Sequence, residues 1–184
     1  MTTATLLVLA ASFAAPAPVK PKDQWIGVVV CCKESAETYE LLENGKFELK
    51  AFYMRYLDMR VIEEKGDFLA LQHDSDIVWV KKESALRPRE AINYYTEVMD
   101  KNANDQRAIA CRCWAYMAVR EYDRALKDAE EAVRMSPQSA AWKNNRGEVH
   151  IKSKNYDKAI EEFTGLLTTN PTYFFALYNR SEAY

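Results

Sequence analysis

A repeat with a period of 34 residues constrains this sequence more than any other feature. Residues 107–137 and 141–171 align at that offset, so that Tyr122 falls on Tyr156 and Pro137 falls on Pro171. A period in this range is typical of an architecture in which similar supersecondary units stack on their neighbours. The second half of the chain is therefore expected to be an array of such units.

Each unit is predicted to consist of two helices joined by a tight turn, because apolar residues recur at helical spacing in both halves of a unit. Asp105 and Ser139 are the expected N-caps of the first helices, since their side-chain oxygens can accept from free backbone amides. Pro137 and Pro171 follow the second helices, which a proline cannot continue. Where the two helices cross closely the residue must be small, and this position holds Cys113, Gly147 and Ser181 in successive units.

These landmarks resemble those of tetratricopeptide repeats. The resemblance divides the helical part into a partial unit over 87–105, full units over 106–139 and 140–173, and a truncated unit over 174–184. It implies an all-α solenoid whose first helices line a concave groove. The truncated unit would leave apolar rings uncovered, so we expect the chain to self-associate through it or to fray from about Phe174 onward.

The start of the chain has a different character. Residues 5–15 form a short apolar run, and the proline-rich stretch 15–22 follows it. This pattern predicts a secretory signal peptide and a spacer over residues 1–22, and hence an exported protein, periplasmic or extracellular. No Lys or Arg precedes the apolar run, so a disordered start or an apolar first helix in a cytoplasmic protein remains the alternative.

Residues 23–86 show a period of two, which is typical of strands. Strands are expected near 25–32, 54–64, 67–73 and 77–82, with turns at Asn44-Gly45 and Lys65-Gly66-Asp67. Short strands with tight turns predict a small β-barrel. The alternative is a generic β-meander that caps the helical array.

The last predicted hairpin resembles the closing hairpin of bacterial Src-homology-3-like (SH3-like) domains, and Trp79-Val80-Lys81 carries that resemblance. The fold class predicted for the chain is therefore α+β: a small SH3-like β-barrel followed by an all-α tetratricopeptide solenoid. The tandem resembles a class of exported bacterial proteins, planctomycete ones among them.

Composition and motifs argue against several functions. The formal net charge is −2, so nothing predicts binding to nucleic acid or anionic lipid. No run is long and apolar enough to span a membrane. The sequence has no glycine-rich phosphate loop, GxSxG or HExxH motif, so no enzyme, cofactor or metal site is predicted. The four cysteines are expected to be small buried thiols, and His150 is expected to be a packed repeat residue.

The tetratricopeptide resemblance also implies which residues line the groove. The candidates for binding a peptide are polar or aromatic side chains at these positions: Arg107, Trp114, Asn144, Asn145, Glu148, Lys152, Tyr178 and Asn179. An asparagine side chain offers both a donor and an acceptor to a peptide backbone. The three asparagines are therefore the expected contacts for an extended segment.

One subgroup of these repeats grips the C-terminal carboxylate of heat-shock chaperones with a clamp of Lys, Asn, Asn, Lys and Arg. Only Asn145 matches that clamp here. The other four positions hold Ala110, Trp114, Phe175 and Asn179. A carboxylate without cations would be desolvated with little compensation, so we do not expect a chaperone adaptor of this subgroup.

The sequence thus predicts a non-catalytic scaffold that binds a protein or peptide segment in the groove. A second hypothesis places the activity in the barrel, which would bind peptidoglycan or another cell-wall polymer through Tyr56 and Trp79 as exposed aromatic side chains. A third hypothesis treats the chain as a fragment of a larger enzyme whose catalytic domain lies beyond residue 184.

Overall fold

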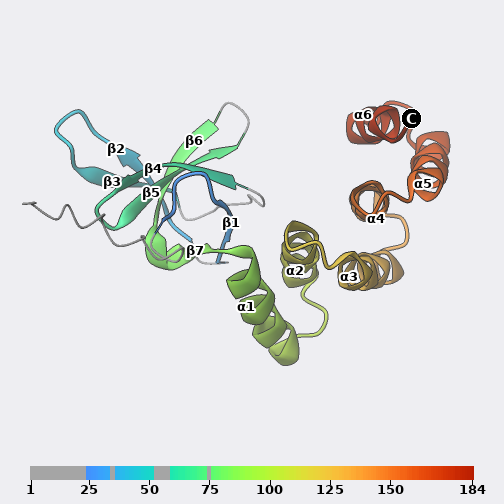
Figure 1. The fold of residues 1–184 in the computed structure, drawn as a ribbon, viewed down its shortest axis with the longest axis horizontal. Coiled ribbons are helices and arrows are strands. Elements are labelled where there is room, and N and C mark those ends of the chain that lie inside the picture. Colours follow the sequence, from blue (N-terminus) through green and yellow to red (C-terminus); the bar gives the residue numbers. More distant parts are fainter. Residues whose placement is uncertain (1–23, 34–35, 52–58, 74–75) are drawn as a thin grey trace, which may run out of the picture.

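The computed structural model describes residues 24–33, 36–51, 59–73 and 76–184, and it places the strands before the helices (Figure 1). The strands are β1 (Val29–Cys32), β2 (Thr38–Leu41), β3 (Phe47–Ala51), β4 (Met59–Lys65), β5 (Phe68–His73), β6 (Asp76–Lys81) and β7 (Ala85–Leu86). The helices are α1 (Pro88–Lys101), α2 (Gln106–Ala118), α3 (Tyr122–Met135), α4 (Ala140–Lys152), α5 (Tyr156–Thr169) and α6 (Phe174–Ala183). A short 3-10 helix, η1 (Lys82–Ser84), links β6 to β7. The predicted order of a β unit and then a helical array is confirmed.

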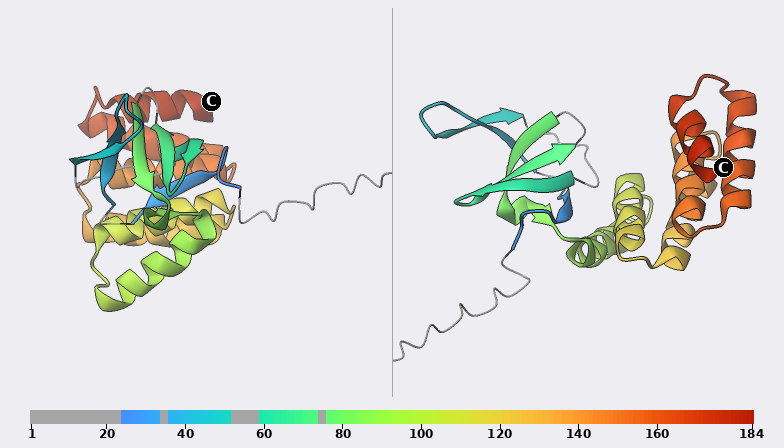
Figure 2. Two further views of the ribbon diagram at one scale, coloured as in Figure 1. Left: turned by 90° about the vertical axis from the view of Figure 1, so that its left-hand side faces the viewer. Right: turned by 45° about the horizontal axis from the view of Figure 1, so that its top comes forward.

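The strands form one antiparallel sheet in the order β3-β2-β6-β5-β4-β1-β7. Both β3 and β7 lie at an edge, so the described strands make a curved half-barrel (Figure 2). The sequence predicted the turn at Asn44-Gly45 but not β2 and β3, which pair on either side of it. Gly45 has a φ of 78°, a conformation that glycine adopts without a steric penalty.

The period-two pattern correctly located one face of the sheet. Side chains on this face are fully buried and belong to one cluster: Val30, Met59, Val61, Leu69, Leu71 and Val80. Burying side chains of this size contributes roughly 1.5–3 kcal/mol each. This cluster is the core of the half-barrel.

A second cluster joins the half-barrel to the helices. Adjacent strand residues point to opposite faces, so Cys32 lies in the half-barrel core while Cys31 packs in a cluster with Tyr95 of α1 and Cys111 of α2. The Tyr95 hydroxyl donates a 2.6 Å hydrogen bond to the carbonyl oxygen of Cys32. The β unit therefore covers part of the first helix, as the capping alternative proposed.

The helices follow one another as antiparallel pairs along the array (Figure 2). Both predicted N-caps are confirmed, since Asp105 Oδ1 accepts from the Ala108 amide at 2.9 Å and Ser139 Oγ accepts from the Trp142 amide at 3.4 Å. These caps mark where α2 and α4 begin.

The predicted close crossing of helices is also present. A Cβ atom built at Gly147 of α4 would lie 2.5 Å from the ring of Phe163 in α5, and that ring is fully buried. One repeat earlier, Cys113 and Ala129 occupy the equivalent positions in one cluster. The second full unit thus pairs the smallest residue, Gly147, with the large ring of Phe163. The first full unit fills the same space with two smaller side chains, Cys113 and Ala129.

We expect Gly147→Ala to lower the free energy of unfolding by about 2 kcal/mol, because the added methyl group overpacks the Phe163 ring. The matched control is Gly165→Ala in α5, where an added Cβ would meet nothing within 4 Å. That control should raise the free energy of unfolding by about 0.5–1 kcal/mol. Urea unfolding followed by circular dichroism measures both, and equal stability of the two variants would contradict the packing argument.

We expect Tyr95→Phe to lower the free energy of unfolding by about 1–2 kcal/mol, because it removes a buried hydrogen bond between α1 and β1. Tyr116→Phe is the control, since the Tyr116 hydroxyl makes no hydrogen bond to another described residue. Thermal unfolding should separate the two variants. If both melt together with the parent protein, the Tyr95 hydroxyl does not stabilise the junction.

Candidate functional site

The candidate site is the surface shared by α2, α4 and α6, the first helices of successive units. We call it the first-helix surface, and it carries the eight peptide-binding candidates predicted from the sequence. Two pairs join α4 to α6 across it. Asn179 Nδ2 donates to Asn144 Oδ1 at 3.2 Å, and Lys152 Nζ lies 3.7 Å from Glu182 Oε1. The structure thus brings together residues that lie about one repeat apart in sequence.

Each pair changes what its members can offer to a ligand. Asn144 is buried and held by Asn179, so it is better placed to position its neighbours than to contact a peptide. The ammonium group of Lys152 is partly neutralised by the Glu182 carboxylate. Asn145 differs, because it is half-buried and its carboxamide makes no hydrogen bond to any other described residue.

The two aromatic candidates differ in exposure: Trp114 is buried and Tyr178 is exposed. Trp114 is only 9% exposed and packs in the cluster that joins the half-barrel to the helices. Tyr178 is 61% exposed, and its ring stacks on that of Phe174 with centroids 6.4 Å apart. Arg107 and Glu148 are half-buried on α2 and α4. Tyr178 and Lys152 are therefore the exposed members of the predicted set, and Asn145 is the half-buried member whose carboxamide has no partner among the described residues.

Of the two barrel candidates, only Trp79 lies within the described residues. Tyr56 lies outside the described residues, and the expectation that Trp79 is exposed is wrong, since it is 8% exposed. Trp79 points to the sheet face opposite the core, but Phe47 from the β2–β3 hairpin lies against it with ring centroids 5.1 Å apart. Tyr39 pairs directly with it across the strands. The hairpin that sequence analysis missed is what covers this side chain.

Sequence analysis also missed a series of arginines with the repeat period. Arg112 donates to both carboxylate oxygens of Asp128 through Nε and Nη2, at 2.9 and 2.7 Å. Arg146 contacts Glu162 through the same two nitrogens, at 2.9 and 2.7 Å. Both pairs join the first helix of a unit to its second helix. The signal was visible in the sequence, because Arg112, Arg146 and Arg180 are 34 residues apart.

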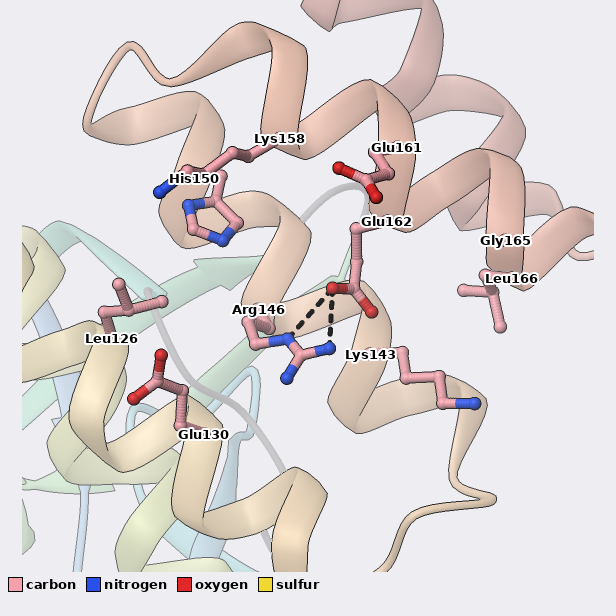
Figure 3. A pocket seen from close by; sticks show the side chains of 10 residues that line it. All are labelled: Leu126, Glu130, Lys143, Arg146, His150, Lys158, Glu161, Glu162, Gly165 and Leu166. Atoms are coloured by element: carbon pink, nitrogen blue, oxygen red, sulfur yellow. Dashed lines mark hydrogen bonds and ion pairs between the residues drawn. The ribbon is translucent and has the colours of Figure 1, made fainter.

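A concavity of about 600 Å³ lies between α3 and α5, with α4 as its floor (Figure 3). We call it the α3–α5 pocket. Arg146 and His150 line its floor, and Lys158 and Glu162 of α5 stand on one wall. Burial is the main cause that lowers the pKa of His150, and the Lys158 ammonium group is the next. The expected packed environment of His150 is confirmed.

The cysteines are poorly suited to catalysis. All four are free and buried. Burial raises the pKa of Cys32 to about 12 and also raises the pKa of Cys31 and Cys113, which disfavours the reactive thiolate. Within the ranges that the structure describes, no group of three or more His, Cys, Asp or Glu side chains is placed to hold a metal ion. Over the same residues, no helix has both the length and the apolar character needed to cross a membrane.

Comparison with known proteins decides the nature of the helical part. A family model described as a tetratricopeptide repeat matches residues 113–173. The six helices form a helical array of the tetratricopeptide type, and the family match itself covers residues 113–173. Hsp70-Hsp90 organizing protein 3 of Arabidopsis thaliana is 32% identical over 82 residues, which are 45% of this chain and 15% of the relative. The Plasmodium falciparum (isolate 3D7) Hsp70-Hsp90 organising protein is 45% identical over 42 residues, or 23% of this chain and 7% of that protein.

Solved structures are similar in the same region. The second tetratricopeptide domain of human RPAP3, solved in complex with an HSP70 peptide, is 22% identical, with 52% of this chain and 80% of that chain covered and a TM-score of 0.47. MamA from Desulfovibrio magneticus RS-1 is 24% identical, with 53% and 55% covered and a TM-score of 0.47. The array spans only a small part of the curated relatives' length, so the activities of those proteins do not transfer to it directly.

We expect Asp128→Ala to lower the free energy of unfolding of the array by about 3 kcal/mol, because it leaves the half-buried Arg112 guanidinium without its carboxylate partner. Glu131→Ala is the control on the same helix. It breaks only the solvent-exposed pair with Arg134, and its effect should be too small to resolve. Urea unfolding of both variants tests the contrast. Similar losses from the two substitutions would show that burial does not set the strength of these pairs.

Proposed function

We propose that this chain is a non-catalytic interaction module, whose first-helix surface binds an extended protein segment. The half-buried Asn145 carries this proposal, because its carboxamide is unpaired within the described residues and offers both a donor and an acceptor. One asparagine can hold a peptide group of an extended ligand at both its N–H and its C=O. Tyr178, exposed on the neighbouring first helix, supplies an aromatic surface for a ligand side chain.

The charges of this surface favour an internal segment over a chain terminus. A terminal carboxylate needs cations or several N–H donors to offset its desolvation. Ala110, Trp114, Phe175 and Asn179 stand at positions where the chaperone-binding clamp has other residues, and Lys152 is paired with Glu182. An internal segment carries no such charge, and its backbone amides match the free carboxamide of Asn145.

A chaperone C-terminal segment is the second candidate ligand. The similarity to Hsp70-Hsp90 organizing proteins favours it, because that similarity spans much of the array. Only Asn145 of the clamp is present, so recognition would have to rely on the peptide backbone and side chains instead of the terminal carboxylate.

Three further proposals rest on residue patterns outside the array, and a fourth rests on α6. The apolar run at 5–15 supports export, the Trp79-Val80-Lys81 segment supports an SH3-like identity of the half-barrel, and that identity supports cell-wall binding. Exposed rings on α6, at Phe174 and Phe175, support self-association. A pull-down of the full chain with isolated cell-wall sacculi and a sedimentation run would test the last two proposals.

The main proposal is tested with a displayed library of random peptides, followed by fluorescence polarisation of the selected peptide. Asn145→Ala and Tyr178→Ala should each weaken its binding by about tenfold or more, as expected for the loss of a central contact. Lys127→Ala, an exposed residue on the outer face of α3, is the control and should bind normally. If neither of the two substitutions alters binding, the first-helix surface is not the site.

The same assay separates the two candidate ligands. The probe is the peptide SGPTIEEVD, the HSP70 segment bound to RPAP3, as the free acid and with an amidated C-terminus. We expect the two forms to differ less than about threefold, because no free cation clamp is present. Much tighter binding of the free acid, lost in Lys152→Ala, would favour the chaperone-tail candidate and contradict the internal-segment proposal.

A further inference from the structure

The α3–α5 pocket lies on a different side of α4 from the first-helix surface. Its floor residues Lys143, Arg146 and His150 follow the spacing of one helix face, whereas Asn144 and Glu148 belong to the other set. Figure 3 shows the two floor side chains Arg146 and His150 between α3 and α5. A ligand in this pocket would therefore not compete for space with one on the first-helix surface.

His150 has an unpaired polar atom in this pocket. Its side chain is 8% exposed, and its Nδ1 is the one buried side-chain nitrogen or oxygen in the described residues that lacks a hydrogen-bond partner. Buried polar atoms are nearly always hydrogen-bonded, so an exception needs an explanation. In Figure 3 the imidazole ring lies at the pocket beside Lys158 and Leu126.

Arg146 has a second unpaired group, which comparison across the repeats reveals. Arg112 Nη1 donates at 3.2 Å to the hydroxyl of Thr96, which lies 16 residues earlier. Arg180 Nη1 makes the same contact with Thr164, at 3.5 Å. The residue 16 before Arg146 is Glu130, and among the described residues no hydrogen bond or ion pair joins the two. Arg146 Nη1 is thus a free donor at the floor of the pocket.

The charges around the pocket balance one another. Lys143, Arg146 and Lys158 are cationic, and Glu130, Glu161 and Glu162 are anionic. A carboxylate ligand would meet the three glutamates, and an ammonium ligand would meet the three cations. An uncharged ligand avoids both conflicts, so the pocket favours a neutral group that hydrogen-bonds.

The protonation state of His150 indicates which neutral group the pocket can bind. Burial and the cations Lys158 and Arg146 lower its pKa, and they outweigh Glu162 and Glu130, which act in the opposite direction. Because its pKa is lowered, the imidazole is mostly neutral at pH 6.5 and increasingly so above it, and in that form one ring nitrogen is an acceptor and the other a donor. An acceptor at His150 and a donor at Arg146, both in the lining of one pocket, complement the N–H and the C=O of an amide.

We propose that the α3–α5 pocket is a second binding site that takes an amide group from a partner protein. The amide oxygen accepts from Arg146 Nη1. The amide N–H donates to His150 Nδ1, which is buried, so binding requires the ring or the Lys158 side chain beside it to turn. The group can be the side-chain carboxamide of Gln or Asn, or a backbone amide of an extended segment. With this site, one unit of the array presents two surfaces to partners, one on each side of α4.

NMR titration of the full chain at pH 7.5 tests the proposal. The probes are N-acetyl, N-methylamide derivatives of Gln, Ala, Glu and Lys. The Gln derivative should shift the side-chain signals of His150 and Arg146, while the Glu and Lys derivatives should bind about tenfold more weakly because the pocket's own charges oppose them. Equal shifts from Ala and Gln would identify the backbone amide as the group bound. No shift from any probe, or tighter binding of Glu than of Gln, would overturn the proposal.

Two variants separate binding from folding. His150→Leu removes the acceptor and should abolish the shifts at Arg146, and it should leave the free energy of unfolding unchanged or higher because an unpaired buried nitrogen is lost. Asn145→Ala should leave the shifts intact, because that residue lies on the first-helix surface. If His150→Leu binds the Gln derivative normally, the imidazole is not part of a site.

The pH dependence provides an independent check. Protonation of His150 replaces the acceptor with a donor, so the preference for Gln over Glu should disappear as the pH falls through its lowered pKa. The preference should still be present at pH 6.5, where an unperturbed histidine would be half protonated. A preference lost well above pH 6.5 would contradict the neutral imidazole on which the proposal depends.

Discussion

The close crossing of the two helices within each unit is the contact on which the rest of the array depends. At Gly147 the Phe163 ring approaches the backbone of α4 so closely that no Cβ fits between them. This contact fixes how far α4 is rotated about its own axis. The rotation in turn decides that Asn145 faces the first-helix surface while Arg146 and His150 face the α3–α5 pocket. Both proposed sites therefore follow from one packing contact that neither site contains.

The half-barrel packs against the first helices of the array and covers their apolar face. A stack of helix pairs leaves an apolar face uncovered at each end. Here Cys31 and Tyr95 bury that face against the sheet, and the Tyr95 hydroxyl satisfies a strand carbonyl in the same place. Successive side chains of β1 point to opposite faces of the sheet. One strand therefore contributes to two clusters, since Cys31 packs against the helices and Cys32 packs in the half-barrel core. The β unit thus has a structural role in the array.

Features determined by local sequence were predictable, and features determined by distant residues were not. The caps at Asp105 and Ser139 and the small residue at Gly147 are encoded within one unit, and the structure has all of them. The burial of Trp79 depends on Phe47, more than thirty residues earlier, so its own alternation could not reveal it. The pairing of Lys152 with Glu182 was unpredictable for the same reason, because it joins two residues that are distant in sequence. The arginine series is the exception, because its 34-residue spacing was present in the sequence and went unused.

The two sides of α4 differ in how their polar groups are satisfied. On the first-helix surface the buried Asn144 is held by Asn179, and the unpaired carboxamide of Asn145 belongs to a half-buried side chain that water still reaches. In the pocket, His150 Nδ1 is unpaired, and the Thr that completes the arginine contact in the neighbouring units is replaced by Glu130. A buried polar atom without a partner destabilises the folded chain unless something pairs with it. The pocket therefore gains more from a hydrogen-bonding ligand than the first-helix surface does, even though family resemblance draws attention to the latter.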